Sequence, residues 1–485
     1  CRIQGNAEFP AIKSIHASCA ANAATGISRP RPFNVLYRLR RSMKGFSNRL
    51  RWYLRAPARR IRRYVLVPLR RVFGPRIPIA MITGTKGKTT TTRMLAHILS
   101  GAGHRVGFTS TDGVVINGQF INRIDSAGYT GAHTVLADRA ITAAVLETAR
   151  GDLLNTGMYI DRCAVAALLN VGREQIGIDG IDTVEQMAAL KQQVIDASRG
   201  TVVLNADDLQ CARLIGHYPS HRVILFSLVA DNQRVHEHIE KGGTAYIQNS
   251  SAEGNRIERL DRESSTPVIS IAQLPSGENG LFPQNIANAM AAAALAEGMA
   301  IPMDKVRGAL RSFRNSLEQS PGRFNMLEGY SQTILLDNAI HVPSCAALVS
   351  SLGGMNVPGR RICLYETMGN RPDWHYTELG ETLGPHFDHF ICYDHAQHRR
   401  GRAPGEIPDL LKTGLIHAGV SPECVDTAKG YANATKQLMK VVGDNDLVVI
   451  LTGCAYRFLP VFLENFPCTG SGNSNNRDID GQDCC

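Results

Sequence analysis

The stretch TGTKGKTTTT, at residues 83–92, constrains the fold more than any other part of this chain. It follows an apolar run of strand length at 77–82 and precedes a run, beginning at Met94, with apolar residues at helical spacing. Glycines at 101 and 103 are placed to end that predicted helix. The order strand, glycine-rich turn, helix is the context that a phosphate-binding loop requires.

The turn carries the groups that a phosphate needs. Its backbone N–H groups and the positive end of the following helix dipole favour an anion. Lys88 adds a mobile positive charge, and Thr89 adds a hydroxyl suited to Mg²⁺. In the common pattern G-x-x-x-x-G-K-[ST] the first glycine would fall at Ile82, but here it is Gly84, so the loop is a shortened variant. The alternative interpretation is a polar turn before a helix that binds nothing.

The chain around this turn predicts an α/β fold. Further buried strands are predicted at 143–148, 163–171, 200–208 and 222–228. Helical patterns separate them, and such alternation implies a mostly parallel sheet with helices on its faces. Residues 230–280 predict a small antiparallel excursion at the domain edge, and 285–299 predict an alanine-rich helix.

A second α/β unit is predicted to start near Pro321. Its strands are expected at 333–339, 360–367, 388–394 and 447–453. The predicted fold class is therefore α/β, with a P-loop parallel-sheet central ATPase domain and a smaller Rossmann-like α/β C-terminal domain. The predicted boundaries are a basic, partly disordered or amphipathic N-terminal region at 1–76, the central domain at 77–320, the C-terminal domain at 321–466 and a disordered tail at 467–485.

The net charge of +10 is concentrated at one end of the sequence. Residues 1–76 hold eighteen Lys or Arg and one acid, a net +17, which leaves −7 for the remainder. Apolar and aromatic residues interleave with the arginines between about 32 and 72, as in a basic amphipathic helix. Such a helix can bind an anionic membrane surface, act as a targeting peptide, pack on its own body or bind RNA, and we favour the membrane surface.

The rest of the composition points to the cytoplasm. No apolar run reaches the roughly 18 residues of a membrane span. The twelve cysteines form no C-x-x-C pair, and five of them lie in or beside apolar runs: Cys163, Cys345, Cys363, Cys392 and Cys454. We expect these five to be buried free thiols in a reducing compartment. The expected localisation is cytoplasmic, with peripheral membrane association through the basic region.

Several motifs in one order carry a resemblance to a known family. TGTKGKTT resembles the ATP loop of the Mur ligases and folylpolyglutamate synthases. The remaining marks resemble the C-terminal ligase module of cyanophycin synthetases: TSTDGVVINGQ (109–119), VLETARGDLL (145–154), GIDGIDTVEQMAALK (177–191), VVLNADD (202–208), NIANAMAAAALA (285–296) and RGRAPGEIPDLL (400–411). The resemblance covers about residues 77–460.

The resemblance implies an ATP-dependent, ADP-forming amide ligase. An acceptor carboxylate would attack the γ-phosphate of ATP, and the amine of an amino acid would displace phosphate from the acyl phosphate. The expected cofactors are ATP and Mg²⁺, the expected partners are an amino acid and a carboxylate-bearing acceptor, no nucleic acid is expected, and an oligomer is left open. Cyanophycin synthetases carry an ATP-grasp domain ahead of this module, where this chain has a basic region of about 76 residues, so we expect at most one of the two ligation activities here.

The resemblance also implies site residues. Catalytic roles fall on Lys88, Glu147, Lys191 and Arg323. Nucleotide contacts fall on Gly84, Thr85, Lys86, Gly87, Lys88, Thr89, Thr90, Asn285, Asn288, Arg323 and Asp337. Metal ligands fall on Thr89, Glu147 and Lys191, the lysine as its carbamate. Glu147 also ends a buried apolar strand, where a carboxylate without a cation is costly. The alternatives are that Arg150 neutralises Glu147 and that Lys191 is an ordinary surface lysine.

Some positions depart from the family pattern. Lys86 stands where the family usually has Asn, Glu174 and Gln175 replace an Asp-His pair, and His341 sits one place late. Gln175 predicts a weakly held second Mg²⁺. Two other hypotheses stay open. One is a non-catalytic ligase-like ATP-binding regulator or subunit, and the other, suggested by the basic region at 1–76, is a nucleic-acid-stimulated P-loop ATPase. The identities of the amino acid and the acceptor are beyond the sequence.

Overall fold

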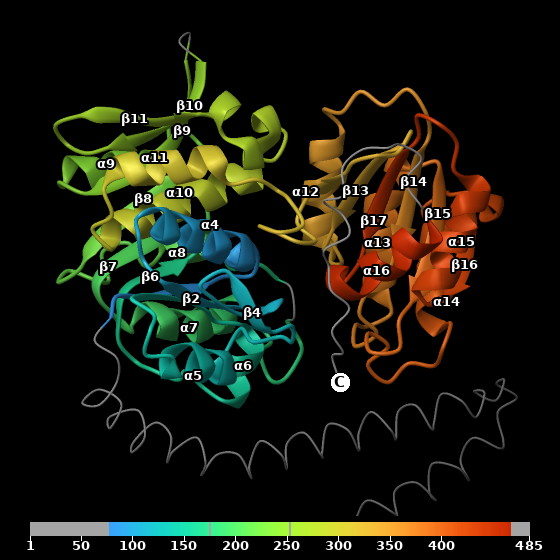
Figure 1. Ribbon diagram of the computed structural model, residues 1–485, viewed down its shortest axis with the longest axis horizontal. Helices are drawn as coiled ribbons and strands as arrows, with labels where there is room; N and C mark the ends of the chain where they lie inside the picture. Colours follow the sequence, from blue (N-terminus) through green and yellow to red (C-terminus); the bar gives the residue numbers. More distant parts are fainter. Residues whose placement is uncertain (1–76, 174–175, 252–253, 467–485) are drawn as a thin grey trace, which may run out of the picture. The chain divides into compact units, whose positions relative to one another are not determined.

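The computed structural model describes residues 77–173, 176–251 and 254–466, all of which fall in one compact unit, Ile61–Cys485 (Figure 1). The described residues form an eleven-stranded sheet and a six-stranded sheet with helices on their faces, so the predicted α/β fold class is confirmed. The predicted basic region at 1–76 and tail at 467–485 lie outside the described residues. The boundaries proposed at 76, 320 and 466 stay predictions.

The larger sheet is parallel in its middle and antiparallel at both edges. Its order is β11-β10-β9-β8-β7-β6-β1-β5-β2-β3-β4. The strands are β1 Ile79–Thr83, β2 Val106–Ser110, β3 Gly113–Ile116, β4 Gln119–Asn122, β5 Ala143–Glu147, β6 Cys163–Leu168, β7 Ser198–Asn205, β8 Arg222–Ser227, β9 Thr244–Ser251, β10 Gly254–Leu260 and β11 Ser265–Ser270. Strands β9 to β11 confirm the antiparallel excursion predicted within 230–280. The β3–β4 hairpin at the opposite edge was not predicted.

Strand alternation divides the core of this sheet into two apolar layers. On β1, Ala80 and Ile82 join the layer under α4 (Lys88–Gly101), α10 (Pro283–Gly298) and α11 (Met303–Ser312). Ile79 and Met81 join the opposite layer, which is covered by α5 (Tyr129–Ala137) and α7 (Val184–Ile195), and Figure 1 shows the two groups of helices on opposite faces. The small side chains of the alanine-rich helix α10 are buried throughout 289–296 and let it lie close to the sheet beside α4.

The second sheet has the order β12-β13-β17-β14-β15-β16, and all its pairings except β12–β13 are parallel. Its strands are β12 Asn325–Leu327, β13 Thr333–Asp337, β14 Arg361–Tyr365, β15 His389–Asp394, β16 Val425–Lys429 and β17 Leu447–Leu451. The apolar layers beneath its helices involve α12 Val342–Leu352, α13 Trp374–Leu383 and α14 Glu406–His417 on one face, and α15 Tyr431–Val441 and α16 Ala455–Asn465 on the other. The four predicted strands are confirmed, and β12 and β16 were missed.

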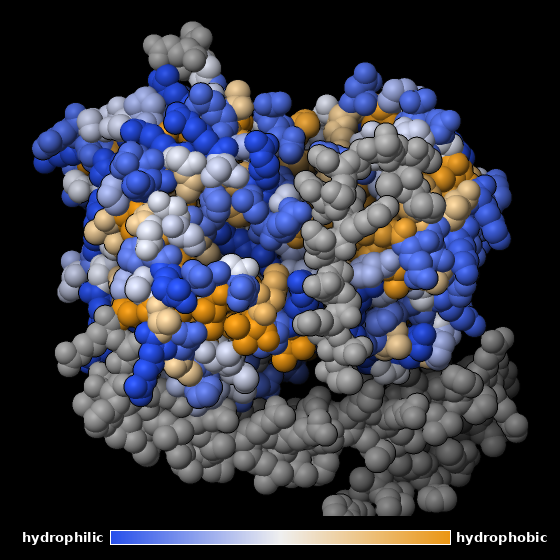
Figure 2. Space-filling view, in the orientation of Figure 1, coloured by the Kyte–Doolittle hydropathy of each residue, from blue (hydrophilic) through white to orange (hydrophobic). Residues whose placement is uncertain are grey.

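Large apolar side chains are exposed at the β4 edge of the larger sheet. Figure 2 shows apolar surface gathered over the region of β4 and α5. Ile121 on β4 is 53% exposed and Ile124, just beyond it, is 52% exposed.

No helix in the described part of the chain combines the length and the apolar character needed to cross a membrane. Cys163, Cys345, Cys363 and Cys392 are buried free thiols as predicted, whereas Cys454 is partly exposed.

Candidate active site

The glycine-rich turn joins β1 to α4 as the sequence predicts. Gly87 is the N-cap of α4 with φ 78°, a left-handed conformation that glycine adopts easily. Among the described residues no side chain caps this helix, so its first N–H groups are left for another acceptor. Asn170, just after β6, holds the loop: its Oδ1 accepts from the amides of Thr85 at 3.0 Å and Lys86 at 2.8 Å. Lys88 Nζ donates to the carbonyl of Thr85 at 3.1 Å.

Glu147 lies at the end of β5 beside the start of α4. Its side chain is 1% exposed, and its Oε2 accepts from the hydroxyl of Thr89 at 2.8 Å. Its Oε1 is buried and has no hydrogen-bond partner within the described part of the chain. Arg150 pairs instead with Asp179 at 3.2 Å, so the alternative in which Arg150 neutralises Glu147 is wrong.

Burial raises the pKa of Glu147 to about 7, against the opposing effects of Lys88 and of the hydrogen bond from Thr89. Asp112 and Asp125 raise it further through their negative charge. A buried carboxylate with one vacant oxygen and a nearby hydroxyl is a donor set of hard oxygens, which suits Mg²⁺. The residues present therefore fit the cation that the sequence predicts. In the described residues no three His, Cys, Asp or Glu side chains cluster as a metal site.

Lys191 reaches the same loop from α7. It is 2% exposed, and its Nζ donates to the carbonyl of Gly84 at 2.8 Å. The alternative of an ordinary surface lysine is therefore wrong. Its predicted carbamylation and metal role stay predictions. Glu174 and Gln175, from which a weak second Mg²⁺ was predicted, lie outside the described residues.

Asn285 and Asn288 lie on the buried face of α10, under the loop. Asn288 Oδ1 accepts from the hydroxyl of Thr91 at 3.2 Å, and a Cβ on Gly87 would lie 2.3 Å from that oxygen. Asn285 donates to the carbonyl of Ser276 at 2.9 Å and accepts from Asn288 at 3.3 Å. The two amides thus fix the floor of the loop, and their predicted contacts to a nucleotide stay predictions.

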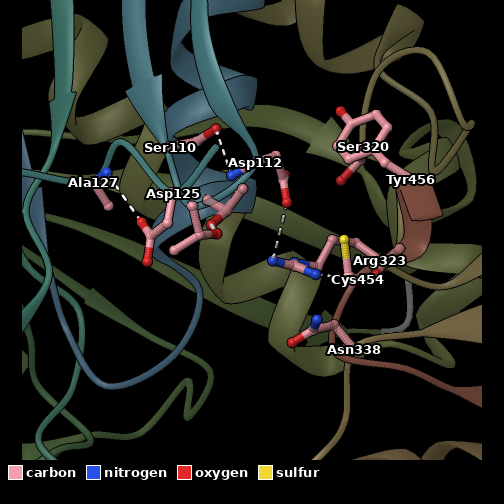
Figure 3. A network of polar contacts seen from close by, with 12 residues as sticks. Ser110, Asp112, Asp125, Ala127, Ser320, Arg323, Asn338, Cys454 and Tyr456 are labelled. Carbon is pink, nitrogen blue, oxygen red and sulfur yellow. Dashed lines mark hydrogen bonds and ion pairs between the residues drawn. The ribbon is translucent and has the colours of Figure 1, made fainter. Parts of the chain in front are cut away.

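Arg323 and Asp337 come together where the chain enters the second sheet. Asp337 is buried, and its Oδ2 accepts from the amide of Phe324 at 2.8 Å. Burial raises the pKa of Asp337 to about 6, against the opposing charge of Arg323. Arg323 Nη2 lies 4.0 Å from Asp112 Oδ1, and Figure 3 shows these two side chains pointing toward each other.

His341, the residue before α12, is near enough to the loop for the charges of two loop lysines to act on it. Its pKa is lowered to about 3, first by burial and then by the charges of Arg371, His375, Lys86 and Lys88. Loops after strands of both sheets thus contribute to one region around Lys88. Sequence reasoning placed most of these residues but missed Asn170 and the pairs that Asp112 makes. Asn170 carried a usable signal, since a polar residue at the carboxyl end of a parallel strand lies where such sheets bind ligands.

Comparisons with known proteins find similarity to a ligase family over the larger sheet. Residues 82–296 match the family model described as Mur ligase middle domain. A cyanophycin synthetase from Nostoc sp. is 34% identical over 383 residues, 78% of this chain and 41% of the relative. One from Synechocystis sp. is 37% identical over 344 residues, 70% of this chain and 38% of the relative. This chain therefore spans less than half the length of these relatives.

A solved structure described as E. coli FolC in complex with DHPP and ADP has a TM-score of 0.56 and 18% sequence identity. The alignment covers 80% of this chain and 89% of that one. At this identity the similarity shows a shared fold.

Proposed function

We propose that this chain is an ATP-dependent amide ligase that joins an amino acid to an acceptor carboxylate and releases ADP. The match of residues 82–296 to the Mur ligase middle domain model and the similarity to cyanophycin synthetases support the proposal. The observation that carries the proposal is the buried Oε1 of Glu147, which has no hydrogen-bond partner among the described residues. It lies beside Thr89 and Lys88 at the start of α4, a helix that no described side chain caps. This is the arrangement expected for a polyphosphate bound with a divalent cation.

The proposed reaction has two balanced steps. An oxygen of the acceptor carboxylate attacks the γ-phosphorus of ATP, the bond to the β-phosphate breaks, and ADP leaves. The amine nitrogen of the amino acid then attacks the acyl carbon, phosphate leaves, and the nitrogen loses a proton. The amide is the product of the second step.

The residues of this chain supply positioning and charge. Thr89 and Glu147 would hold Mg²⁺, whose chemistry is to neutralise the charge of the phosphates. Lys88 and the N–H groups at the start of α4 bind the phosphates, and Lys88 stabilises charge that develops during transfer. Asp337 accepts hydrogen bonds at the ribose, and Arg323 binds the terminal phosphate. Lys191, as its carbamate, would hold a second metal ion.

The proposed reaction needs an acceptor with a free carboxylate, so acidic compounds are the class to screen. The experiment is a screen of amino acids against acidic peptides and small carboxylic acids, with ADP release as the signal. We expect release to require both substrates and Mg²⁺. Lys88→Ala should lower it about a thousandfold, while Lys305→Ala, at an exposed lysine on α11, should not.

The outcome also separates the competing hypotheses. ATP binding that Lys88→Ala abolishes, with silence across the whole screen, would support the regulator or subunit. ATP hydrolysis stimulated by RNA or DNA would support the nucleic-acid ATPase. ADP release that needs neither an amino acid nor an acceptor would contradict the ligase.

The proposal includes a membrane-surface role for residues 1–76. Their net charge of +17 opposes a net −7 in the remainder of the chain. Binding to vesicles of anionic lipid should weaken steeply with salt, because a surface potential is screened within a Debye length. Removal of 1–76 should abolish the binding and leave ADP release intact. Equal vesicle binding by the full and shortened chains would exclude the role.

A further inference from the structure

Asp112 occupies an unusual place between two arginines. It follows β2 and its Oδ2 accepts from Arg93 Nη2 at 3.1 Å, while its Oδ1 lies 4.0 Å from Arg323 Nη2 (Figure 3). The carboxylate is also close enough to Glu147 to raise the pKa of that group. A second anion beside a buried carboxylate is unfavourable unless cations compensate it. Asp112 therefore has a cost that its contacts with the two arginines must offset.

Arg93 fixes the position of Asp112. It lies on α4, is 5% exposed, and donates from Nη1 to the carbonyl of Gln319 at 3.3 Å. Its Nη2 also donates to the hydroxyl of Tyr456 at 3.3 Å. The guanidinium lies 5.6 Å from the ring of Phe108. With so many restraints on Arg93, the carboxylate that it holds is a fixed anion.

The backbone turn that carries Arg323 is also held by several hydrogen bonds. Gly322 and Phe324, on either side of it, have φ of 67° and 53°, and a positive φ is strained for phenylalanine. The strain is held by Asp337 on the amide of Phe324 and by Asn325, which donates to the carbonyls of Asn315 and Ser320 at 2.8 and 2.9 Å. Strained backbone that its surroundings overdetermine is a common feature of functional sites.

A rigid turn sets the direction in which the Arg323 side chain leaves the backbone, but its long side chain keeps several rotatable bonds. Its Nη1 donates to the carbonyl of Gly322 at 2.9 Å, which restrains one of the three nitrogens of the guanidinium. Asp112 Oδ1 lies 4.0 Å from a second one, Nη2. We propose that Asp112 is a positioning residue: it holds the guanidinium of Arg323 on the loop side of the site, ready for the terminal phosphate of ATP. The inference rests on the proposed function for the role of Arg323.

The test is a double-mutant cycle on nucleotide binding, which does not depend on ligation. Four proteins are compared: the parent, Asp112→Asn, Arg323→Ala and the double variant. Calorimetry gives the affinity of each for ADP and for the β,γ-methylene analogue of ATP, both with Mg²⁺. Arg323→Ala should reduce the preference for the triphosphate about tenfold, and Asp112→Asn should reduce it by a similar factor. In the Arg323→Ala background, Asp112→Asn should leave the preference unchanged or raise it, because only direct repulsion of the phosphates is then removed.

Asp125→Asn is the matched control. The charge of Asp125, like that of Asp112, raises the pKa of Glu147, and the charge of Lys88 lowers the pKa of Asp125. Unlike Asp112, Asp125 accepts its hydrogen bond from a backbone amide, that of Ala127. Its removal should change the preference equally with and without Arg323. The inference is overturned if Asp112→Asn also acts equally in both backgrounds, or if Arg323→Ala leaves the preference unaltered. Either result leaves the ligase proposal standing, since ADP release in the screen tests that separately. Thermal unfolding of each variant verifies the fold.

Discussion

Two buried glutamates stand at the carboxyl ends of parallel strands, one in each sheet, and they differ in how they are satisfied. Glu147 ends β5, is 1% exposed and has one oxygen with a partner and one without among the described residues. Glu366 follows β14 and is 0% exposed. Its Oε1 accepts from the hydroxyl of Thr452 at 2.7 Å and the amide of Gly453 at 3.0 Å, and its Oε2 lies 3.1 Å from His398 Nδ1.

The comparison shows how to separate a structural carboxylate from a binding one. Burial is equal at the two sites, so burial alone does not distinguish them. Glu366 is complete within the protein and ties β14 to the turn after β17. Among the described residues only one oxygen of Glu147 has a hydrogen-bond partner. A buried polar atom without a partner needs an explanation, and a bound ligand is one. The two sites should therefore respond in opposite ways to the same substitution.

The largest expected effect is on activity at the first site. Glu147→Gln should lower ADP release about a thousandfold, about 4 kcal/mol, because the amide cannot hold Mg²⁺ as a carboxylate does. The measurement uses the substrate pair found in the screen, at saturating Mg²⁺. Glu366→Gln, measured per folded molecule, should stay within a few-fold of the parent. An equal loss at both positions would end the distinction between them.

The next effect is on the stability of the metal-free protein. The folded-state pKa of Glu147 is raised from 4.5 to about 7, so ionisation costs folding energy. That cost is absent below about pH 4.5, grows between the two values and is full above about pH 7, where it reaches about 3 kcal/mol. Glu147→Gln should thus stabilise the chelator-treated protein by up to this amount at pH 8 and hardly at all at pH 4. Denaturant unfolding at a series of pH values measures the difference, and a loss of stability at pH 8 would contradict it.

At the second site the sign should reverse. Glu366→Gln replaces one of two carboxylate oxygens that both have partners, so the free energy of unfolding should fall by about 2 kcal/mol. The same unfolding experiment at pH 8 gives the comparison directly. A variant as stable as the parent would mean that Glu366 is not the structural group its contacts indicate.

The smallest expected effect concerns one bond to Glu366. Thr452→Val keeps the shape of the side chain and removes its hydroxyl, which should cost about 1 kcal/mol of stability. The loss should shrink when Glu366 is already leucine, which has no acceptor, and only the bond from the amide of Cys454 to the hydroxyl should then remain to be lost, as a double-mutant cycle would show. Additive losses in that cycle would place the effect of Thr452 outside its contact with Glu366.

Sequence patterns predicted what is local. The loop between β1 and α4 follows from an apolar run, two glycines and helical spacing, and Glu147 follows from its position at the end of an apolar strand. The β3–β4 hairpin was missed although Asn117-Gly118, with φ of 50° and 81°, is a strong turn signal between two short strands. The pairing of Asp112 with Arg323 and the saturation of Glu366 by Thr452 could not be predicted. Both join residues far apart in the chain. The order of strands places β14 beside β17 and so Glu366 beside Thr452, whereas Asp112 and Arg323 belong to different sheets.

The turn that carries Arg323 has a mechanical consequence. Arg323 stands two residues before Asn325, which opens β12 and pairs with Leu336 in the second sheet. Its guanidinium is thus mounted on the joint through which the chain passes from one sheet to the other, with an anchor to Asp112 on the side of the larger sheet. A terminal phosphate bound by this guanidinium would contact the segment that joins the two sheets, whereas a diphosphate would lack that contact. Binding of the terminal phosphate at Arg323, as proposed above, would therefore distinguish ATP from ADP at the segment that joins the two sheets.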